Sequence, residues 1–406
     1  MADGFLKLSG AFDEANEADW LEAVSKALKG GGIERLQRKT DDGLTIQPLY
    51  RENDFASATD PRGVPGEAPY LRGASAEPDA FLPWDIRQSF GHPDPDVTNS
   101  EILRDLERGV SSVELAIDCT GKEGVAVYDA DTLSAALSGV RADIATIAVD
   151  HRGLGSGTSI AGLLALWGEQ HGDAEKLRFA FNIDPIGLLM RKGEIEGGVD
   201  AAFVRTAELS RLLCLRYPKS TTLRTDARPV HEAGGSEAQE LGVLIAHAVD
   251  TMRRLDAAGF DINAVPSQTV FTLAASGNYG LEIAKLRAAR RLWARVQEAM
   301  DLDIEPMVLQ SVSSARMLTR YDPWVNMLRN TAACFAGAVG GADIVTVRAF
   351  NEALGVPEEL GRRTARNTQV IAMEESGLGR IADPAGGAWF EETLADDLAE
   401  AAWAVF

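Results

Sequence analysis

Residues 276–295 read SGNYGLEIAKLRAARRLWAR, and this stretch decides how the chain around it is interpreted. Its apolar residues recur at steps of three and four, at Ile283, Leu286, Ala289 and Trp293. This spacing predicts a helix with one buried face. Basic side chains stand between the apolar ones, and their long stems can cover apolar surface while the charges stay in water. Because a short apolar run lies on each side, the helix is expected to connect two strands.

The same alternation of strand and helix continues from residue 110 to the end of the chain. Strands are expected at 112–118, 144–150, 179–184, 221–226, 269–275, 307–311, 343–347 and 379–382. Helices are expected at about 131–140, 158–170, 199–217, 235–257, 279–300, 322–337, 358–376 and 392–405. Eight strand–helix units predict an α/β fold, a (β/α)8 TIM barrel. A doubly wound open sheet is the alternative, but the chain lacks a dinucleotide-binding fingerprint.

The residues before the barrel have a different character. A short helix is expected around residues 20–28, and glycines at 30–32 end it. Residues 36–95 carry half of the chain's 16 prolines and no helical or strand period. The aromatic side chains of this segment favour an extended arm that is held against another surface. We therefore divide the chain into an N-terminal helix and arm, residues 1–109, and a barrel, residues 110–406.

Composition limits the classes of function. The chain has 406 residues and a formal net charge of -21, which argues against nucleic acid or an anionic membrane as a partner. The three cysteines, Cys119, Cys214 and Cys334, have no paired spacing that would indicate zinc or disulfides. No secretory signal and no apolar run long enough for a membrane span are found. A cytoplasmic protein is expected.

Several residues at predicted strand ends could carry chemistry. Five of the strands end in aspartate, at Asp118, Asp150, Asp184, Asp226 and Asp383. The carboxyl ends of barrel strands face the active site, where carboxylates can bind Mg²⁺ or act as acid and base. Aspartate at such turns more often caps a helix, so no metal site is assigned.

Two further features after the predicted strands are ambiguous. The loop GLGSGTS at residues 153–159 could hold a phosphate, but it has no Walker A lysine and is better explained as a flexible loop. His151 and His231 could each act as a general acid, although lone histidines usually have structural roles. The residues by themselves thus predict a barrel with a long arm and no defined reaction.

Several motifs in the order of the chain resemble those of the methylmalonyl-CoA mutase family. They are the helix LRAARRLWA, PYLRG at 69–73, PWDIRQ at 83–88, ARNTQ at 365–369, EESG at 374–377 and IADPAGG at 381–387. In that family an acyl-CoA threads the barrel axis and adenosylcobalamin lies across the strand ends, held by a separate C-terminal domain. The resemblance implies that the arm contacts CoA or a partner subunit. The cobalamin motif DxHxxG is absent from this chain, so that domain is expected to be missing from it.

The resemblance also shows which family residues this chain has replaced. The substrate-facing tyrosine is Ser89 here, the arginine before PW is Leu82, and the arginine of another strand is Val308. The family's tyrosine–histidine pair corresponds to Arg228 and Pro229. Because Val308 and Leu82 cannot bind an anion, the resemblance implies a chain without catalytic residues. The sequence is similar to the small, non-catalytic subunit of the heterodimeric bacterial enzymes.

The resemblance implies the following assignment. The chain is expected to stabilise a catalytic large subunit of methylmalonyl-CoA mutase in a heterodimer, with a homodimer as the alternative in isolation. Adenosylcobalamin is expected in the holoenzyme, bound by the partner chain, and Glu232 and Glu352 match positions near it. Two other functions stay open. One is an acyl-CoA mutase of altered substrate that uses Asp226, Arg228 and His231, and the other is a sensor of CoA esters.

Overall fold

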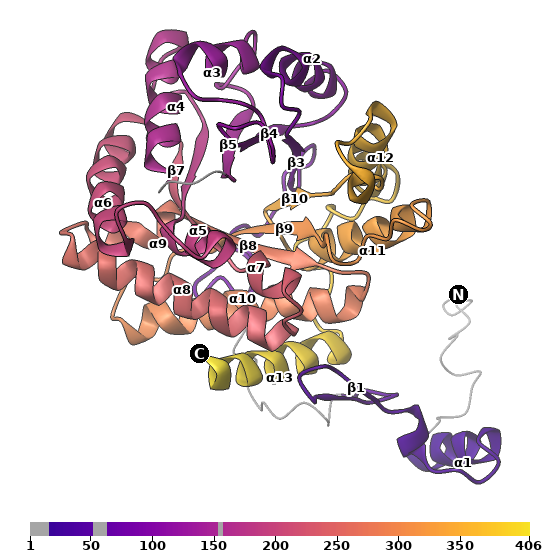
Figure 1. The fold of residues 1–406 in the computed structure, drawn as a ribbon. Helices are drawn as coiled ribbons and strands as arrows, with labels where there is room; N and C mark the ends of the chain where they lie inside the picture. Colours follow the sequence, from indigo (N-terminus) through magenta and orange to yellow (C-terminus); the bar gives the residue numbers. More distant parts are fainter. Residues whose placement is uncertain (1–15, 52–62, 153–156) are drawn as a thin grey trace, which may run out of the picture.

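The computed structural model describes residues 16–51, 63–152 and 157–406. Eight parallel strands form a closed barrel in the order β10-β3-β4-β5-β6-β7-β8-β9 (Figure 1). These strands are β3 (Asp85–Phe90), β4 (Ser112–Ile117), β5 (Thr146–His151), β6 (Phe179–Ile183), β7 (Thr221–Asp226), β8 (Thr269–Ala275), β9 (Val308–Ser313) and β10 (Ile344–Thr346). The predicted TIM barrel is confirmed.

A helix follows each barrel strand and packs on the outside of the barrel (Figure 1). In chain order these helices are α2 (Pro95–Leu106), α3 (Ala130–Ala136), α4 (Thr158–His171), α6 (Val199–Arg216), α8 (Glu237–Ala257), α10 (Tyr279–Ala299), α11 (Val325–Val339) and α12 (Glu359–Val370). Shorter helices occupy some connections: α5 (Pro185–Lys192), α7 (Arg228–Glu232), α9 (Val265–Gln268), and the 3-10 turns η4 (Ile262–Ala264) and η5 (Glu352–Leu354). A π-helical turn, η6 (Ile371–Glu375), extends α12, and α13 (Trp389–Val405) packs against α8 and α10.

The strand predicted at 379–382 is wrong, and β3 takes its place in the barrel. Asp85 of β3 pairs with Ile344 of β10, so the barrel begins before residue 110, within the segment assigned to the arm. Residues 379–382 form turns instead. A Cβ at Gly379 would lie 2.1 Å from Pro83 Cγ, so this turn packs beneath the start of β3 and does not join the sheet. The helix expected to complete the barrel, α13, is consequently an additional outer helix.

The apolar core lies between the strands and the helices. Val113 and Leu115 of β4 pack toward the outer helices in one cluster, and Leu223 of β7 and Leu309 of β9 do so in another. Successive side chains of a strand point to opposite faces. The neighbours of these residues therefore face the barrel interior, and they include charged and amide side chains.

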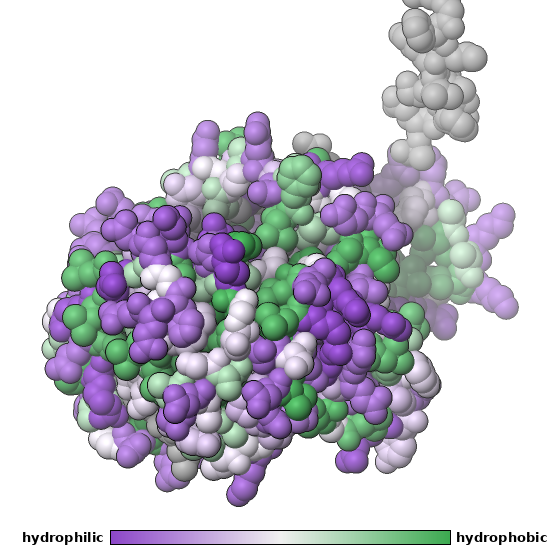
Figure 2. All heavy atoms as spheres, turned by 90° about the horizontal axis from the view of Figure 1, so that it is seen from above, coloured by the Kyte–Doolittle hydropathy of each residue, from purple (hydrophilic) through white to green (hydrophobic). Residues whose placement is uncertain are grey.

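The N-terminal segment stands apart from this core. The helix α1 (Glu17–Ala27) has no buried residue and lies away from the barrel (Figure 1). The 3-10 turn η2 (Ile33–Leu36) and the two-stranded sheet β1 (Arg38–Lys39) and β2 (Thr45–Ile46) connect it to the body. Figure 2 shows hydrophilic residues interspersed with smaller apolar areas on the face that it presents. None of the helices in the described ranges combines the length and apolar character that crossing a membrane requires.

Candidate functional site

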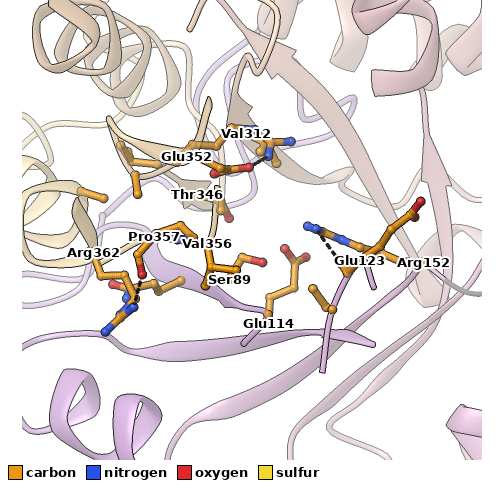
Figure 3. Close-up of a pocket in the computed structure, with 18 of the residues that line it drawn as sticks. Ser89, Glu114, Glu123, Arg152, Val312, Thr346, Glu352, Val356, Pro357 and Arg362 are labelled. Carbon is orange, nitrogen blue, oxygen red and sulfur yellow. Dashed lines mark hydrogen bonds and ion pairs between the residues drawn. The ribbon is translucent and has the colours of Figure 1, made fainter. Parts of the chain in front are cut away.

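A cavity of about 200 Å³ opens near the carboxyl ends of β3, β4 and β10. We call it the mouth cavity, and it lies at the end where the active sites of such barrels are found. Figure 3 shows Glu114 pointing into its centre, with Ser89 and Thr346 nearby. The charged residues that line it are Lys122, Arg152, Arg228, Arg348, Arg362, Glu114, Glu123 and Glu352.

Polar side chains close the barrel axis below the mouth cavity. The Nε2 atom of Gln310 on β9 donates to Glu114 on β4 at 3.4 Å and to Thr346 on β10 at 3.1 Å. Because β10 and β3 separate β9 from β4 in the sheet, the contact between Gln310 and Glu114 crosses the interior. The barrel centre is therefore filled by side chains.

A group of ion pairs fills the other side of the interior. We call Asp150, Arg191, Arg224, Asp226 and Arg228 the interior cluster. Arg224, whose side chain is 0% exposed, donates to Asp150 at 3.0 Å across the intervening strand β6. Arg228 donates to both oxygens of Asp226, at 2.9 and 2.7 Å, and Arg191 donates to the same carboxylate at 3.0 Å. Burial opposes ionisation of Asp226, but the neighbouring guanidinium groups outweigh it and hold the pKa of this carboxyl well below its ordinary value.

A second cavity, of about 780 Å³, lies at the amino ends of the strands. The two cavities share no lining residue. On β9, Val308 lines this lower cavity, Val312 lines the mouth cavity, and Gln310 lies between them. Leu82 also lines the lower cavity. The positions at which the sequence lacks the two family arginines thus both face it.

All five predicted aspartates have hydrogen-bond or ion-pair partners. Four of them lie at strand ends. Asp118 accepts the backbone N–H groups of Thr120, Lys122 and Glu123, so it shapes its own loop. Asp184 caps α5 by accepting the N–H of Gly187. Asp383 does not follow a strand, and it pairs with Arg72 and Arg287. In the described ranges no three His, Cys, Asp or Glu side chains are grouped as metal ligands.

The two candidate histidines have structural partners and do not line the mouth cavity. His151 Nε2 lies 3.0 Å from the carbonyl oxygen of Phe181. His231 Nε2 lies 2.7 Å from Ser314 Oγ. Burial lowers the pKa of each histidine from 6.5 to about 4, so both are neutral at pH 7. Residues 153–156 of the glycine-rich loop lie outside the described residues.

The two glutamates expected near a cofactor also have partners. Glu232 accepts the backbone N–H groups of Ala315 and Arg316 at 2.9 and 2.7 Å, one with each oxygen. Glu352 lines the mouth cavity and pairs with Arg348 at 2.5 Å. Their assignment as cofactor contacts stays a prediction.

Comparison with known proteins agrees with this geometry. The family model for methylmalonyl-CoA mutase matches residues 39–406. The chain belongs to the methylmalonyl-CoA mutase family. The methylmalonyl-CoA mutase small subunit of Streptomyces virginiae is 41% identical over 100% of this chain and 65% of that protein. The small subunit from Propionibacterium freudenreichii subsp. shermanii is 32% identical over 99% of this chain and 63% of its own length. The mitochondrial methylmalonyl-CoA mutase of Bos taurus is 28% identical over 95% and 54%.

The chain spans less than two thirds of the length of the curated relatives described above. The sequence did not point to Glu114 and Gln310, which close the axis, or to Arg224 of the interior cluster. For Glu114 and Gln310 the signal was present as one charged or amide residue inside an otherwise apolar or small-residue strand, in SVELAI and VLQSVS. In this barrel both residues face the interior.

Proposed function

We propose that this chain is the small, non-catalytic subunit of an adenosylcobalamin-dependent methylmalonyl-CoA mutase. In this role it stabilises a catalytic large subunit, which interconverts methylmalonyl-CoA and succinyl-CoA in the cytoplasm. The small-subunit names of the relatives from Streptomyces virginiae and Propionibacterium freudenreichii subsp. shermanii support this role.

The main support for this proposal is that side chains close the barrel axis. The resemblance requires an acyl-CoA to pass along the axis of a catalytic barrel. Here Gln310 and Glu114 meet across that axis, and the mouth cavity above them measures only about 200 Å³. Sites for drug-sized ligands typically measure about 300–1,000 Å³, and a CoA ester is larger than most such ligands. An axis closed in this way also opposes the alternatives of an altered acyl-CoA mutase and a CoA-ester sensor.

The residues at the substrate positions support the same conclusion. Leu82 and Val308 carry no donor for a phosphate or carboxylate, although the lower cavity that they line is large enough for part of a ligand. Arg228 stands at a position where the family has tyrosine. Its Nε and Nη2 atoms donate to Asp226. The rearrangement needs donors aimed at its developing charges, and the corresponding positions do not supply them.

The cofactor is proposed to bind to the partner chain. Cobalamin supplies the radical chemistry of this family. Glu232 and Glu352 are the residues of this chain that match positions near it, but the partners described above occupy both carboxylates. They therefore do not fit the role of direct cobalamin ligands, and we assign no step of the reaction to them.

The N-terminal helix is the proposed contact with the large subunit. No residue of α1 is buried, and Leu21 on it is 40% exposed. An amphipathic helix of 11 residues is too short to be stable by itself in water. A partner surface would supply the packing that the barrel does not.

Co-purification tests this function. We would co-express the full chain with the catalytic mutase chain of the same genome, purify through a tag on this chain, and measure the mass of the product. A stable one-to-one complex is expected. Leu21→Asp on α1 should weaken the complex at least about tenfold, because it places a charge in an apolar contact. Leu215→Asp, on α6 and 85% exposed, is the matched control and should leave it intact. Separate elution of the unaltered chains at micromolar concentration would refute the proposal.

A further inference from the structure

The mouth cavity carries an excess of positive charge, although the chain as a whole has a net charge of -21. Of the charged residues that line it, five are cationic and three are anionic. One of each sign has a partner outside the lining, since Arg362 pairs with Glu101 at 2.8 Å and Glu123 pairs with Lys192 at 2.7 Å. The adjoining interior cluster adds two further arginines and two aspartates. The excess of cations at the mouth therefore remains.

Two of these cations present nitrogen atoms without a partner. Arg152 uses Nε on Asp150 at 3.1 Å and Nη1 on the carbonyl oxygen of Glu123 at 3.2 Å. Arg228, which is 8% exposed, uses Nε and Nη2 on Asp226 at 2.9 and 2.7 Å. In the part of the chain that the structure describes, Nη2 of Arg152 and Nη1 of Arg228 donate no hydrogen bond. Because both residues line the mouth cavity, these N–H groups are available to an anion there.

Glu114 is the carboxylate that lies beside these donors. It is 1% exposed, and its Oε1 atom accepts from Gln310 Nε2 at 3.4 Å. Its charge interacts with the guanidinium groups of Arg152 and Arg228. Figure 3 shows the Arg152 guanidinium beside Glu114 at the edge of the central gap. Within the described ranges, its Oε2 atom accepts no hydrogen bond. Because an ionised carboxylate can only accept, the site combines donors for an anion with one acceptor for a proton.

We propose that the mouth cavity binds inorganic phosphate in the form of hydrogenphosphate. Its unprotonated oxygens accept from Nη2 of Arg152 and Nη1 of Arg228, and its P–O–H group donates to Oε2 of Glu114. Charge-assisted hydrogen bonds of this kind are stronger than neutral ones. The cavity of about 200 Å³ is smaller than a typical site for a drug-sized ligand and suits an anion of this size.

Glu114 makes the site selective for an anion that carries a proton. Sulfate has the size and charge of hydrogenphosphate but no proton at neutral pH, so it would place an oxygen lone pair against the Glu114 carboxylate. A phosphate monoester meets the same obstacle at pH 7.5, because its second pKa is about 6. This inference goes beyond the proposed structural role, because it gives the non-catalytic barrel a ligand of its own.

Calorimetric titration of the full chain with three dianions tests the site. At pH 7.5 and a constant ionic strength set with chloride, inorganic phosphate should bind one-to-one with a Kd below about 1 mM. Sulfate and ethyl phosphate should each bind at least about tenfold more weakly. The proposal is overturned if phosphate does not saturate the chain at millimolar concentration, or if sulfate binds equally well. Equal binding of ethyl phosphate would also overturn it, because the ester has no proton to donate to Glu114.

Two variants assign the selectivity and the affinity to separate residues. In Glu114→Gln the amide can donate to sulfate, so the preference for phosphate over sulfate should fall from at least about tenfold to about threefold or less. Arg152→Gln should weaken the binding of both anions at least about tenfold. The control is Glu169→Gln on α4, where the carboxylate is half exposed and pairs with Arg216 at 3.4 Å. This control should change neither quantity.

An unchanged preference for phosphate in Glu114→Gln would contradict the proposal. The comparison of the three dianions on the unaltered chain needs no variant to fold. Because every titration uses this chain alone, failure of the phosphate site is distinguishable from failure of the chain to associate with a mutase partner.

Discussion

Two groups of buried charges hold this barrel together in different ways. In the interior cluster, three arginines share the carboxylates of Asp150 and Asp226. The second group, which we call the helix triad, consists of Glu240 on α8 and Glu282 and Lys285 on α10. Lys285 lies 2.7 Å from Glu240 and 2.5 Å from Glu282, and all three side chains are fully buried. The cluster has several cations, whereas the triad has one.

This difference in the number of cations determines which single substitution lowers the stability of the barrel most. Glu240 also accepts the N–H of Ala274, and Glu282 accepts that of Ser276, so the helix triad attaches both helices to the end of β8. Burial raises the pKa of Glu240 to about 7, although Lys285 opposes the shift. Removing Lys285 leaves two facing carboxylates without a cation. Removing Arg224 from the interior cluster leaves other arginines on each aspartate.

The largest effect is expected from Lys285→Met. The substitution should lower the free energy of unfolding by about 3–5 kcal/mol, because breaking a buried ion pair leaves an uncompensated charge. Urea denaturation at pH 7.5 measures this loss. In the combined variant Glu240→Gln, Glu282→Gln and Lys285→Met, much of the stability should return. A loss below about 1 kcal/mol in the single variant would show that the triad is not the more vulnerable group.

Acidification should give the next largest effect, through the histidines beside the two groups. His231 Nδ1 lies 3.7 Å from Glu240, and His151 follows Asp150 in the chain. Each has a folded pKa of about 4 and an ordinary value of 6.5. The unfolded chain therefore binds more protons between these values, so stability is fully present above pH 6.5 and is lost as the pH falls toward 4. The loss is on the order of 3 kcal/mol per histidine. Glu240, with its raised pKa, contributes in the opposite direction, because its stabilising effect decreases as the pH rises from 4.5 to 7.

Urea denaturation at pH 7.5 and at pH 4.5 measures this dependence. His151→Gln should lose less stability on acidification than the unaltered chain. His171→Gln, which changes an exposed histidine of α4, is the control and should lose as much as the unaltered chain. Equal losses for all three proteins would show that His151 is not buried in its neutral form.

A smaller effect is expected from Arg224→Met in the interior cluster. Asp150 keeps Arg152 at 3.1 Å, and Asp226 keeps Arg228 and Arg191. We expect a loss of about 2 kcal/mol in the free energy of unfolding, less than for Lys285→Met because each carboxylate retains a cation. The same urea titration measures it. A loss that equals or exceeds that of Lys285→Met would remove the distinction between the two groups.

The outer helices could be predicted from the sequence because each has its own local signals. Helix α8 begins with a capping box formed by Ser236 and Gln239, and its apolar residues follow the helical period. Strand β3 was missed because its sequence, DIRQSF, is mostly polar. Its polar side chains have partners far along the chain, such as Asp105 for Gln88. Only the alternation of Trp84, Ile86 and Phe90, all buried, indicated a strand.

The positions of the site residues were easier to predict than their chemistry. Asp150 and Asp226 were expected at strand ends and are found there. Whether they bind a metal, act as acids or form ion pairs depends on Arg224, which reaches Asp150 from a strand two places away in the barrel. Such cross-barrel contacts have no local signature in the sequence. The closed axis followed only from the structure.

The pairing of β3 with β10 has a consequence for the synthesis of this protein on the ribosome. Strand β3 leaves the exit tunnel well before its second neighbour, which begins at Ile344, about 250 residues further along the chain. At about 5–20 residues per second, β3 waits on the order of tens of seconds with one edge uncovered. Asp85 and Arg87 place charges on that edge. Charged residues on an unpaired strand discourage pairing with other nascent chains. The polar sequence that made β3 difficult to predict therefore also disfavours aggregation of the unfinished barrel.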